Sequence, residues 1–164
     1  MSNTATLSEA VEFAVSFADS ARTRLLHTLE HIPDDKLDWS PAPGAKSAIR
    51  IAAHAALSSG NFVSLLRGDP MPDMPFEEML AGMVAAEVAV KTRAQVIELI
   101  NTNCDSAIAA LKAITPARMA EEVQTPFRPM PVPFIMTLVG RHMDSHAAQI
   151  DYIQTLWGDS EMHF

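Results

Sequence analysis

Apolar residues recur at helical spacing along this chain, and prolines separate the helical stretches from one another. Proline breaks helix interiors and is tolerated mainly in loops and in the first turn of a helix. The eleven prolines fall into four groups, at residues 33–43, 70–75, 116 and 126–133. The stretches outside these groups carry the apolar pattern and predict four long helices.

The first two helices are expected in the N-terminal half of the chain. Thr6 and Glu9 form a T-x-x-E capping box, so the first helix is expected to begin there and to run to about His31. The second is expected to follow a cap at Ser47 and to end at Gly68. Their apolar faces are predicted to consist of Val11, Ala14, Val15, Ala18, Leu25 and Ile32 in the first helix, and of Ile51, Ala55, Phe62, Leu65 and Leu66 in the second.

The last two long helices are expected in the C-terminal half. A short helix is predicted to begin at Pro75, and the third long helix covers roughly Glu87 to Ile114. The fourth is expected to open with Pro133 in its first turn and to close at Gly158. The apolar face of the third helix comprises Val90, Ala94, Ile97, Ile100, Cys104, Ile108 and Leu111.

Together these elements indicate an all-α protein. No alternating run is long enough for a confident strand, although residues 122–132 could form a short ribbon before the fourth helix. We therefore expect one four-helix-bundle domain over residues 1–164, with a longer, proline-containing connection between helices 2 and 3. Cys104 lies on an apolar face, which favours a small buried residue over a reactive thiol.

Composition and charge narrow the classes of partner. Hydrophobic residues make up 48% of the 164 residues and charged residues 20%, which is typical of a globular protein. The formal net charge is −8 and the basic residues are scattered, so binding to nucleic acid or to an anionic membrane is not expected. No apolar stretch reaches the roughly 20 residues of a membrane span. The start MSNTATLSEA lacks the features of a secretory signal, and a single cysteine forms no internal disulfide, so a soluble cytoplasmic protein is expected.

Three histidines stand out because they lie at apolar positions of predicted helices. His142 and His146 are four residues apart in the apolar stripe of the fourth helix, so their rings can be directed at one point. His54 falls on the apolar face of the second helix. Burying unpaired imidazoles costs free energy, whereas a shared divalent cation would satisfy one nitrogen of each ring. The pattern alone leaves two interpretations open: a metal site of His54, His142 and His146, or histidines that pair with buried polar groups.

The other three histidines lack this support. His27 and His31 lie off the apolar stripe near the end of the first helix and are interpreted as surface or C-terminal-turn residues. His163 is expected to be exposed or disordered in the tail.

Three further polar residues lie near the histidines of the fourth helix. Asp144 and Asp151 fall on the polar face and are interpreted as solvated charges. Gln149 lies beside the apolar stripe, where it could orient a ligand or bridge helices. No general base is assigned.

Three segments resemble the DinB-like (DinB/YfiT-like) family of metalloenzymes. The segment IPDDKLDWSPAPGAKS, residues 32–47, is similar to the family's loop between helices one and two. The segment IRIAAHAALSSGNF, residues 49–62, is similar to the helix that carries the first metal histidine. The segment GRHMDSHAAQIDYIQTLWG, residues 140–158, resembles the H-x3-H-x-x-Q signature and the glycine that follows it. The resemblance covers the whole chain in order and spacing.

The resemblance implies a fold, a metal site and a class of chemistry. His54, His142 and His146 match the family's metal triad, and Ala147 stands where the family often has an arginine. The fold would be a four-helix bundle, often paired into a homodimer. Family members include thiol S-transferases, an isomerase that uses a thiol cofactor, and proteins described as hydrolases.

We therefore expect a metal-dependent enzyme that acts on a small-molecule substrate. Three imidazoles leave coordination positions open, as in catalytic metal sites. The reaction would be transfer of a low-molecular-weight thiol or hydrolysis, with zinc, nickel or manganese as the divalent ion. The alternative is a non-catalytic metal-binding or stress-related bundle protein. A third possibility, an interaction module, is raised by four methionines, which suit adaptable apolar surfaces: Met71, Met74, Met79 and Met83.

Overall fold

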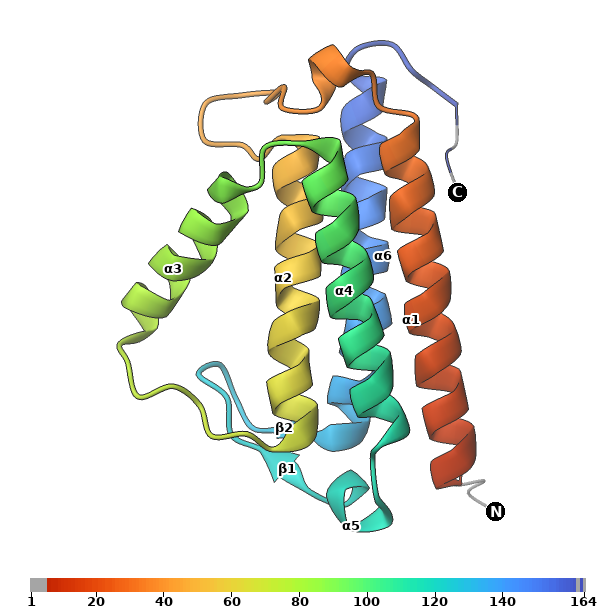
Figure 1. The fold of residues 1–164 in the computed structure, drawn as a ribbon, viewed down its shortest axis with the longest axis vertical. Coiled ribbons are helices and arrows are strands. Elements are labelled where there is room, and N and C mark those ends of the chain that lie inside the picture. The colour runs from red at the N-terminus through yellow and green to blue at the C-terminus, as the bar shows by residue number, and fades with distance from the viewer. Residues whose placement is uncertain (1–5, 162, 164) are drawn as a thin grey trace.

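Four long helices surround one hydrophobic core in the computed structural model, which describes residues 6–161 and 163 (Figure 1). They are α1 (Leu7–Glu30), α2 (Ala48–Arg67), α4 (Arg93–Lys112) and α6 (Val132–Thr155). The predicted all-α four-helix bundle is confirmed. Residues 1–5, which form half of the start considered as a signal sequence, lie outside the described residues.

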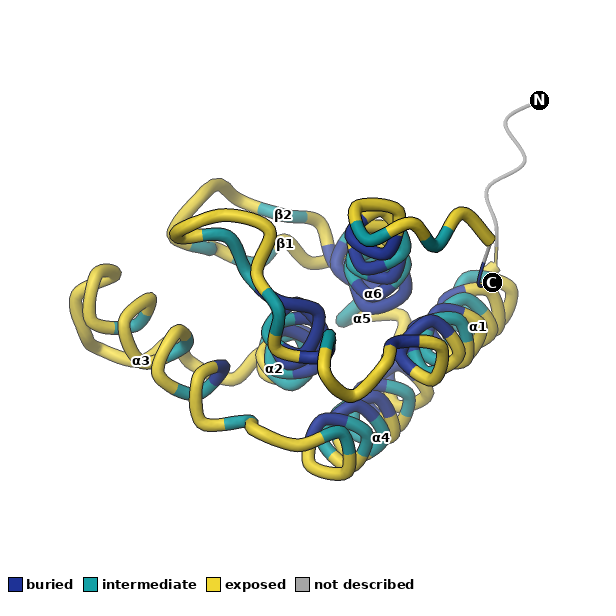
Figure 2. The backbone as a smooth tube through the Cα atoms, turned by 90° about the horizontal axis from the view of Figure 1, so that it is seen from above, coloured by how far each residue is buried: buried dark blue, intermediate teal, exposed yellow. Residues whose placement is uncertain are grey.

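The order of the helices around the core explains the long connection before α4. α1 packs against α6 and α4, while α2 packs against α4 and α6 (Figure 2). α1 and α6 run in one direction, and α2 and α4 run in the opposite direction (Figure 1). Because parallel neighbours cannot be joined by a tight turn, the chain crosses over between α2 and α4 through residues 68–92. The predicted proline-containing connection is this crossover, and it holds α3 (Phe76–Ala89) outside the bundle.

The predicted start of the third long helix at Glu87 is wrong. Glu87 lies in the last turn of α3, and the helix ends before Val90, whose backbone is extended with φ −78° and ψ 116°. α4 then begins with a capping box, in which the side chains of Thr92 and Gln95 each accept a hydrogen bond from the other residue's backbone. The apolar repeat continues across this break, so periodicity alone did not reveal it.

The expected ends of α1 and α2 agree closely with the structure. Thr6 and Glu9 form the capping box at the start of α1. Gly68 ends α2 in the left-handed conformation with φ 81°, which glycine adopts without strain. Ser47 is the residue before α2, but its hydroxyl donates to the Asp38 carboxylate and does not cap the helix.

The shorter elements lie in the connections. The predicted ribbon is confirmed, because β1 (Glu122–Val123) pairs antiparallel with β2 (Met130–Pro131). Two short helical segments, η1 (Asp34–Lys36) and α5 (Pro116–Met119), were not expected from the sequence. α6 starts one residue before Pro133 and ends three residues before Gly158.

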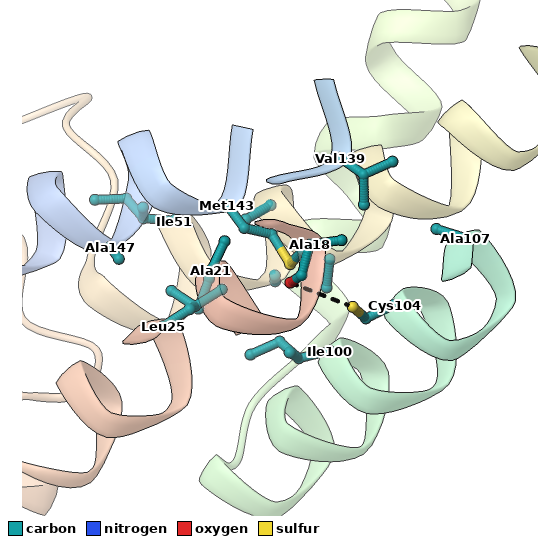
Figure 3. Packing of buried hydrophobic residues seen from close by; sticks show 14 of the residues in the cluster. Ala18, Ala21, Leu25, Ile51, Ile100, Cys104, Ala107, Val139, Met143 and Ala147 are labelled. Atoms are coloured by element: carbon teal, nitrogen blue, oxygen red, sulfur yellow. Dashed lines mark hydrogen bonds between the residues drawn. The ribbon is translucent and has the colours of Figure 1, made fainter. Parts of the chain in front are cut away.

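Small side chains fill much of the core between the helices (Figure 3). Such residues let neighbouring helices approach closely. Cys104 is fully buried, and burial raises the pKa of its thiol to about 11, which confirms the buried rather than reactive interpretation. The buried alanines are Ala14, Ala18, Ala21, Ala48, Ala52, Ala53, Ala55, Ala56, Ala107, Ala110 and Ala147.

Gly140 marks a close approach of α6 to α1. A Cβ atom at this position would lie 2.7 Å from Cγ of Phe17 and 3.0 Å from the backbone carbonyl carbon of Phe17. Because backbone cannot give way as a flexible side chain can, only glycine allows this contact without displacement of a helix. Gly140 is two residues before His142, so the same contact fixes the helix that carries the candidate site.

The expectation that His163 would be exposed or disordered is wrong. The residue is only 5% exposed, and its ring stacks on that of His31 with centroids 4.2 Å apart. Its Nε2 pairs with Oδ2 of Asp159 at 2.9 Å, and its carbonyl accepts a hydrogen bond from the Thr28 hydroxyl at 2.8 Å. Gly158, with φ 96°, permits the turn that brings the tail back to α1.

Large apolar side chains are exposed along α3. Met79 and Met83 are half-buried, and Met83 Sδ accepts a weak hydrogen bond from Asn61 of α2. Met71 and Met74 precede α3 and are exposed. No helix among the described residues is long and apolar enough to span a bilayer. The exposed apolar residues of α3 are Phe76, Leu80, Val84 and Val88.

The Gly140 contact predicts that glycine-to-alanine substitution changes the free energy of unfolding differently at two helical glycines. We expect Gly140→Ala to lower the free energy of unfolding by about 1–3 kcal/mol, because the added methyl group overlaps Phe17. Gly82→Ala in α3 is the control, since nothing lies within 4 Å of its Cβ position. It should leave stability unchanged or raise it by up to about 1 kcal/mol. Urea unfolding of both variants tests this, and equal effects would contradict it.

Candidate metal centre

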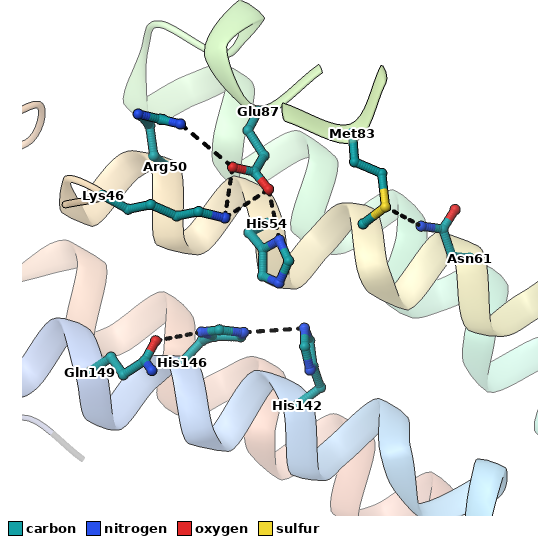
Figure 4. A network of polar contacts seen from close by, with 9 residues as sticks. All are labelled: Lys46, Arg50, His54, Asn61, Met83, Glu87, His142, His146 and Gln149. Atoms are coloured by element: carbon teal, nitrogen blue, oxygen red, sulfur yellow. Dashed lines mark hydrogen bonds and ion pairs between the residues drawn. The ribbon is translucent and has the colours of Figure 1, made fainter. Parts of the chain in front are cut away.

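The three histidines singled out in the sequence meet between α2 and α6 (Figure 4). His142 and His146 lie one turn apart on α6, and His54 faces them from α2. One ring nitrogen from each residue lies within 4.8 Å of the others. The ring centroid of His54 is 5.2 Å from that of His142 and 4.9 Å from that of His146. The structure thus assembles all three candidate ligands.

The histidines lie at the border of the core, whereas the sequence analysis placed His142 and His146 within the apolar stripe itself. All three are half-buried, whereas Met143 and Ala147 of α6 are fully buried. Ala147, the position at which the family often has arginine, therefore faces the core. The imidazoles flank the stripe on the side of α2, where they can be reached from outside.

Hydrogen bonds fix the orientation of two of the rings. His54 Nδ1 donates to Oε1 of Glu87 at 2.7 Å, and His146 Nδ1 donates to Oε1 of Gln149 at 2.7 Å. A neutral imidazole that donates through Nδ1 has its lone pair on Nε2. The Nε2 atoms of His142 and His146 face each other at 3.1 Å. Gln149 therefore orients a candidate ligand, one of the two roles considered for it.

Burial favours the neutral form of the two rings on α6. Burial, together with the neighbouring charges of His146, His54 and Lys46, lowers the pKa of His142 to about 3. Burial also lowers the pKa of His146. Neutral imidazole is the form that binds a metal, so no proton has to be displaced from His142 and His146 at neutral pH.

The donor set fits a divalent transition metal. Imidazole nitrogen suits zinc, nickel and copper, while magnesium and calcium prefer oxygen. Three nitrogen donors leave at least one coordination position of a tetrahedral ion for water or substrate. The residues His54, His142 and His146 could therefore hold a catalytic type of metal ion.

Glu87 is a residue of this site that the sequence analysis missed. Its side chain is only 2% exposed and accepts the hydrogen bond from His54. Lys46 Nζ lies 2.8 Å from each carboxylate oxygen, and an Nη2 of Arg50 lies 3.9 Å from Oε2. The helix dipole disfavours a carboxylate in the last turn of a helix. If the helix break before Thr92 had been recognised, Glu87 would have been placed in the last turn of α3. Other groups would then have been expected to offset the unfavourable interaction of its carboxylate with the helix dipole.

An open groove of about 610 Å³ runs beside the histidines. His54, His146 and Gln149 line it together with the cationic side chain of Lys46. The remaining wall is mainly apolar, so the groove fits a small molecule with an apolar body and a polar group near the histidines. The other lining residues are Pro41, Ala45, Ile51, Ala148, Tyr152 and Ile153.

The remaining candidates lie outside the cluster. His27 is exposed and His31 is the C-cap of α1, as the sequence predicts. Asp144 is partly exposed but forms an ion pair with Arg24 at 2.6 Å, so it is more than a solvated charge. Asp151 accepts a hydrogen bond from the backbone of the tail at 3.4 Å.

A comparison with protein families identifies the chain. A family model described as the DinB superfamily matches residues 18–150, which include the three histidines. The chain belongs to the DinB superfamily. This confirms the resemblance found in the sequence. No curated protein matches the chain.

Solved structures show the same fold at low sequence identity. A DinB-like protein of Bacillus subtilis, YjoA, is 19% identical with a TM-score of 0.66, over 93% of this chain and 96% of that chain. YfiT of Bacillus subtilis, described as a probable metal-dependent hydrolase with an unusual four-helix bundle topology, is 12% identical with a TM-score of 0.69, over 94% and 93%. A mycothiol-dependent maleylpyruvate isomerase is 16% identical with a TM-score of 0.71, over 85% of this chain and 60% of that chain.

The lowered pKa of His142 predicts an acid-sensitive fold in the absence of metal. Below pH 6.5 the unfolded chain takes up a proton that folded His142 does not accept until about pH 3, so stability falls as the pH falls through this window. We expect His142→Gln to lose part of this pH dependence. Urea unfolding of metal-free protein between pH 7 and 4 measures it. The exposed His27→Gln variant is the control, and identical pH profiles for both variants would refute the assignment.

Proposed function

We propose that this DinB-superfamily protein is a metal-dependent enzyme that acts on a small molecule bound in the groove beside His54 and His146. The observation that supports it most is the convergence of three imidazoles, two of which, His54 and His146, line an open groove. A structural metal site is usually closed by four protein ligands, whereas this cluster offers three.

The residues around the cluster have separable roles in this proposal. His54, His142 and His146 hold a divalent cation, and Gln149 keeps His146 in the required orientation. When bound, such a cation supplies Lewis-acid chemistry, because it lowers the pKa of water or of a thiol and polarises carbonyl groups. The apolar walls hold the body of the substrate, and Lys46 places a positive charge at the edge of the groove.

Two reaction classes follow from the same site. In thiol transfer, the sulfur of a low-molecular-weight thiol forms a bond to an electrophilic carbon, the leaving group departs, and the thiol proton is released. In hydrolysis, water adds to a carbonyl carbon and the bond to the leaving group breaks. The neighbour described as a mycothiol-dependent isomerase supports a role for a thiol at such a site, and the neighbour described as a probable metal-dependent hydrolase supports hydrolysis. A non-catalytic metal-binding bundle is the alternative.

The proposal predicts about one divalent ion per chain. We expect protein purified without an affinity tag to bind one zinc, nickel or manganese ion per chain, and His54→Ala, His142→Ala and His146→Ala each to lose it because only two imidazoles remain. Elemental analysis after dialysis measures the stoichiometry, and circular dichroism shows whether the helices persist. His31→Ala, in a ring pair outside the cluster, is the matched control.

Retention of the ion by all three variants would show that it binds elsewhere. No uptake by the wild-type protein of added zinc, nickel or manganese would overturn the metal-dependent proposal.

A metal-dependent enzyme and a non-catalytic metal-binding bundle differ in whether they turn over a substrate. We expect the metal-loaded protein to consume either a free thiol in the presence of an electrophile or a small ester or amide, and we expect His146→Ala to lose that activity. Loss of free thiol and release of a chromophoric leaving group are the two readouts. Metal binding without turnover in either assay would favour the non-catalytic alternative.

The homodimer implied by the family resemblance stays a prediction. The apolar side chains on the outer face of α3 are a surface that a second copy could cover. Solution mass at several protein concentrations tests it.

A further inference from the structure

α3 is held against the bundle largely through one polar residue. The half-buried side chains Met79, Met83 and Ala86 form its inner face, and Glu87 is the one buried residue of this helix. Within the described residues, the helix partner of α3 is chiefly α2 (Figures 1 and 2). With so little apolar burial, the contacts of Glu87 contribute much of the attachment of α3.

The carboxylate of Glu87 is surrounded by cations and a ring donor from one region of the chain. Lys46, just before α2, and Arg50, in its first turn, bring positive charge to Glu87. His54, one turn after Arg50, donates a hydrogen bond to it (Figure 4). Removing a carboxylate from water is costly unless it is paired and hydrogen-bonded. Anything that strengthens one of these contacts therefore strengthens the hold on the last turn of α3.

His54 connects this carboxylate to the histidine cluster. Its Nδ1 lies 2.7 Å from Glu87, so its Nε2, on the far side of the ring, is free to bind a cation with His142 and His146. A cation bound at one nitrogen withdraws electron density from the ring. The opposite N–H then becomes a better donor, and its hydrogen bond to a carboxylate becomes stronger.

We propose that Glu87 is a positioning residue that couples the three-histidine site to the docking of α3. A divalent cation at His54, His142 and His146 tightens the attachment of α3, and docked α3 raises the affinity for the cation by the same factor, because binding couplings are reciprocal. This inference rests on the proposed function only in requiring that the cluster bind a divalent cation. It does not depend on the reaction.

Zinc affinity of the full-length protein is the first readout. We expect Glu87→Ala to bind zinc about 10- to 100-fold more weakly than wild type in competition with a chromophoric chelator. Glu87→Gln should fall in between, because its amide oxygen still accepts from His54 but carries no charge. Glu78→Gln, which removes an exposed carboxylate from the same helix, is the matched control and should bind as wild type.

Hydrogen exchange in residues 76–89 is the second readout, since it reports on α3 itself. Zinc should slow exchange there in wild type and in Glu78→Gln, and it should have little effect in Glu87→Ala. The visible spectrum of the cobalt-substituted protein provides a further check, because a changed orientation of His54 alters the ligand field whereas a general loss of stability does not. Partial recovery of the wild-type spectrum by Glu87→Gln is the expected result.

The outcomes separate the two proposals. If wild type binds no zinc, both the coupling and the proposed metal site are overturned. If wild type binds zinc and the Glu87 variants match Glu78→Gln in affinity, exchange and spectrum, the coupling is overturned and the metal site stands. Weaker binding by Glu87→Gln with helical content unchanged supports the coupling even if Glu87→Ala folds poorly.

Discussion

The site depends on how closely the helices of the bundle can pack. Alanine supplies much of the buried surface of α2, and Gly140 allows backbone contact between α6 and α1. The distance between two packed helices is set by the side chains between them. With larger residues in these places, α2 and α6 would move apart and His54 would no longer share a centre with His142 and His146. Close packing and the geometry of the histidine cluster are therefore one constraint.

A second constraint is electrostatic. The imidazoles lie at the border of the core, where burial favours the neutral form of His142 and His146 and the groove leaves His54 and His146 accessible. A deeper position would exclude a substrate, and a more exposed one would allow the rings to be protonated or hydrated. Glu87 differs from the imidazoles in being almost fully buried. Its carboxylate is tolerated there because Lys46, Arg50 and the N–H of His54 surround it.

The sequence predicted features that arise from local patterns. The caps at Thr6 and Gly68, the long proline-containing connection and the ribbon follow from short motifs, and the histidines were visible because polar rings occurred among apolar positions. The break before Thr92 was missed because the apolar repeat continues through it. Glu87 and His163 were missed because each has a contact far along the chain that helical periodicity does not show: Glu87 meets His54, 33 positions away, and His163 meets Thr28, 135 positions away.

The position of α6 has a consequence for how the protein is made. This last helix lies between α1 and α2 and supplies two of the three histidines. Until α6 has left the ribosome, the nascent chain can form neither the complete core nor the full set of three histidines, because nothing fills the space between α1 and α2. Any metal that this cluster binds is therefore acquired only after α6 has been made, and a chain without α6 exposes apolar surface that chaperones and proteases recognise.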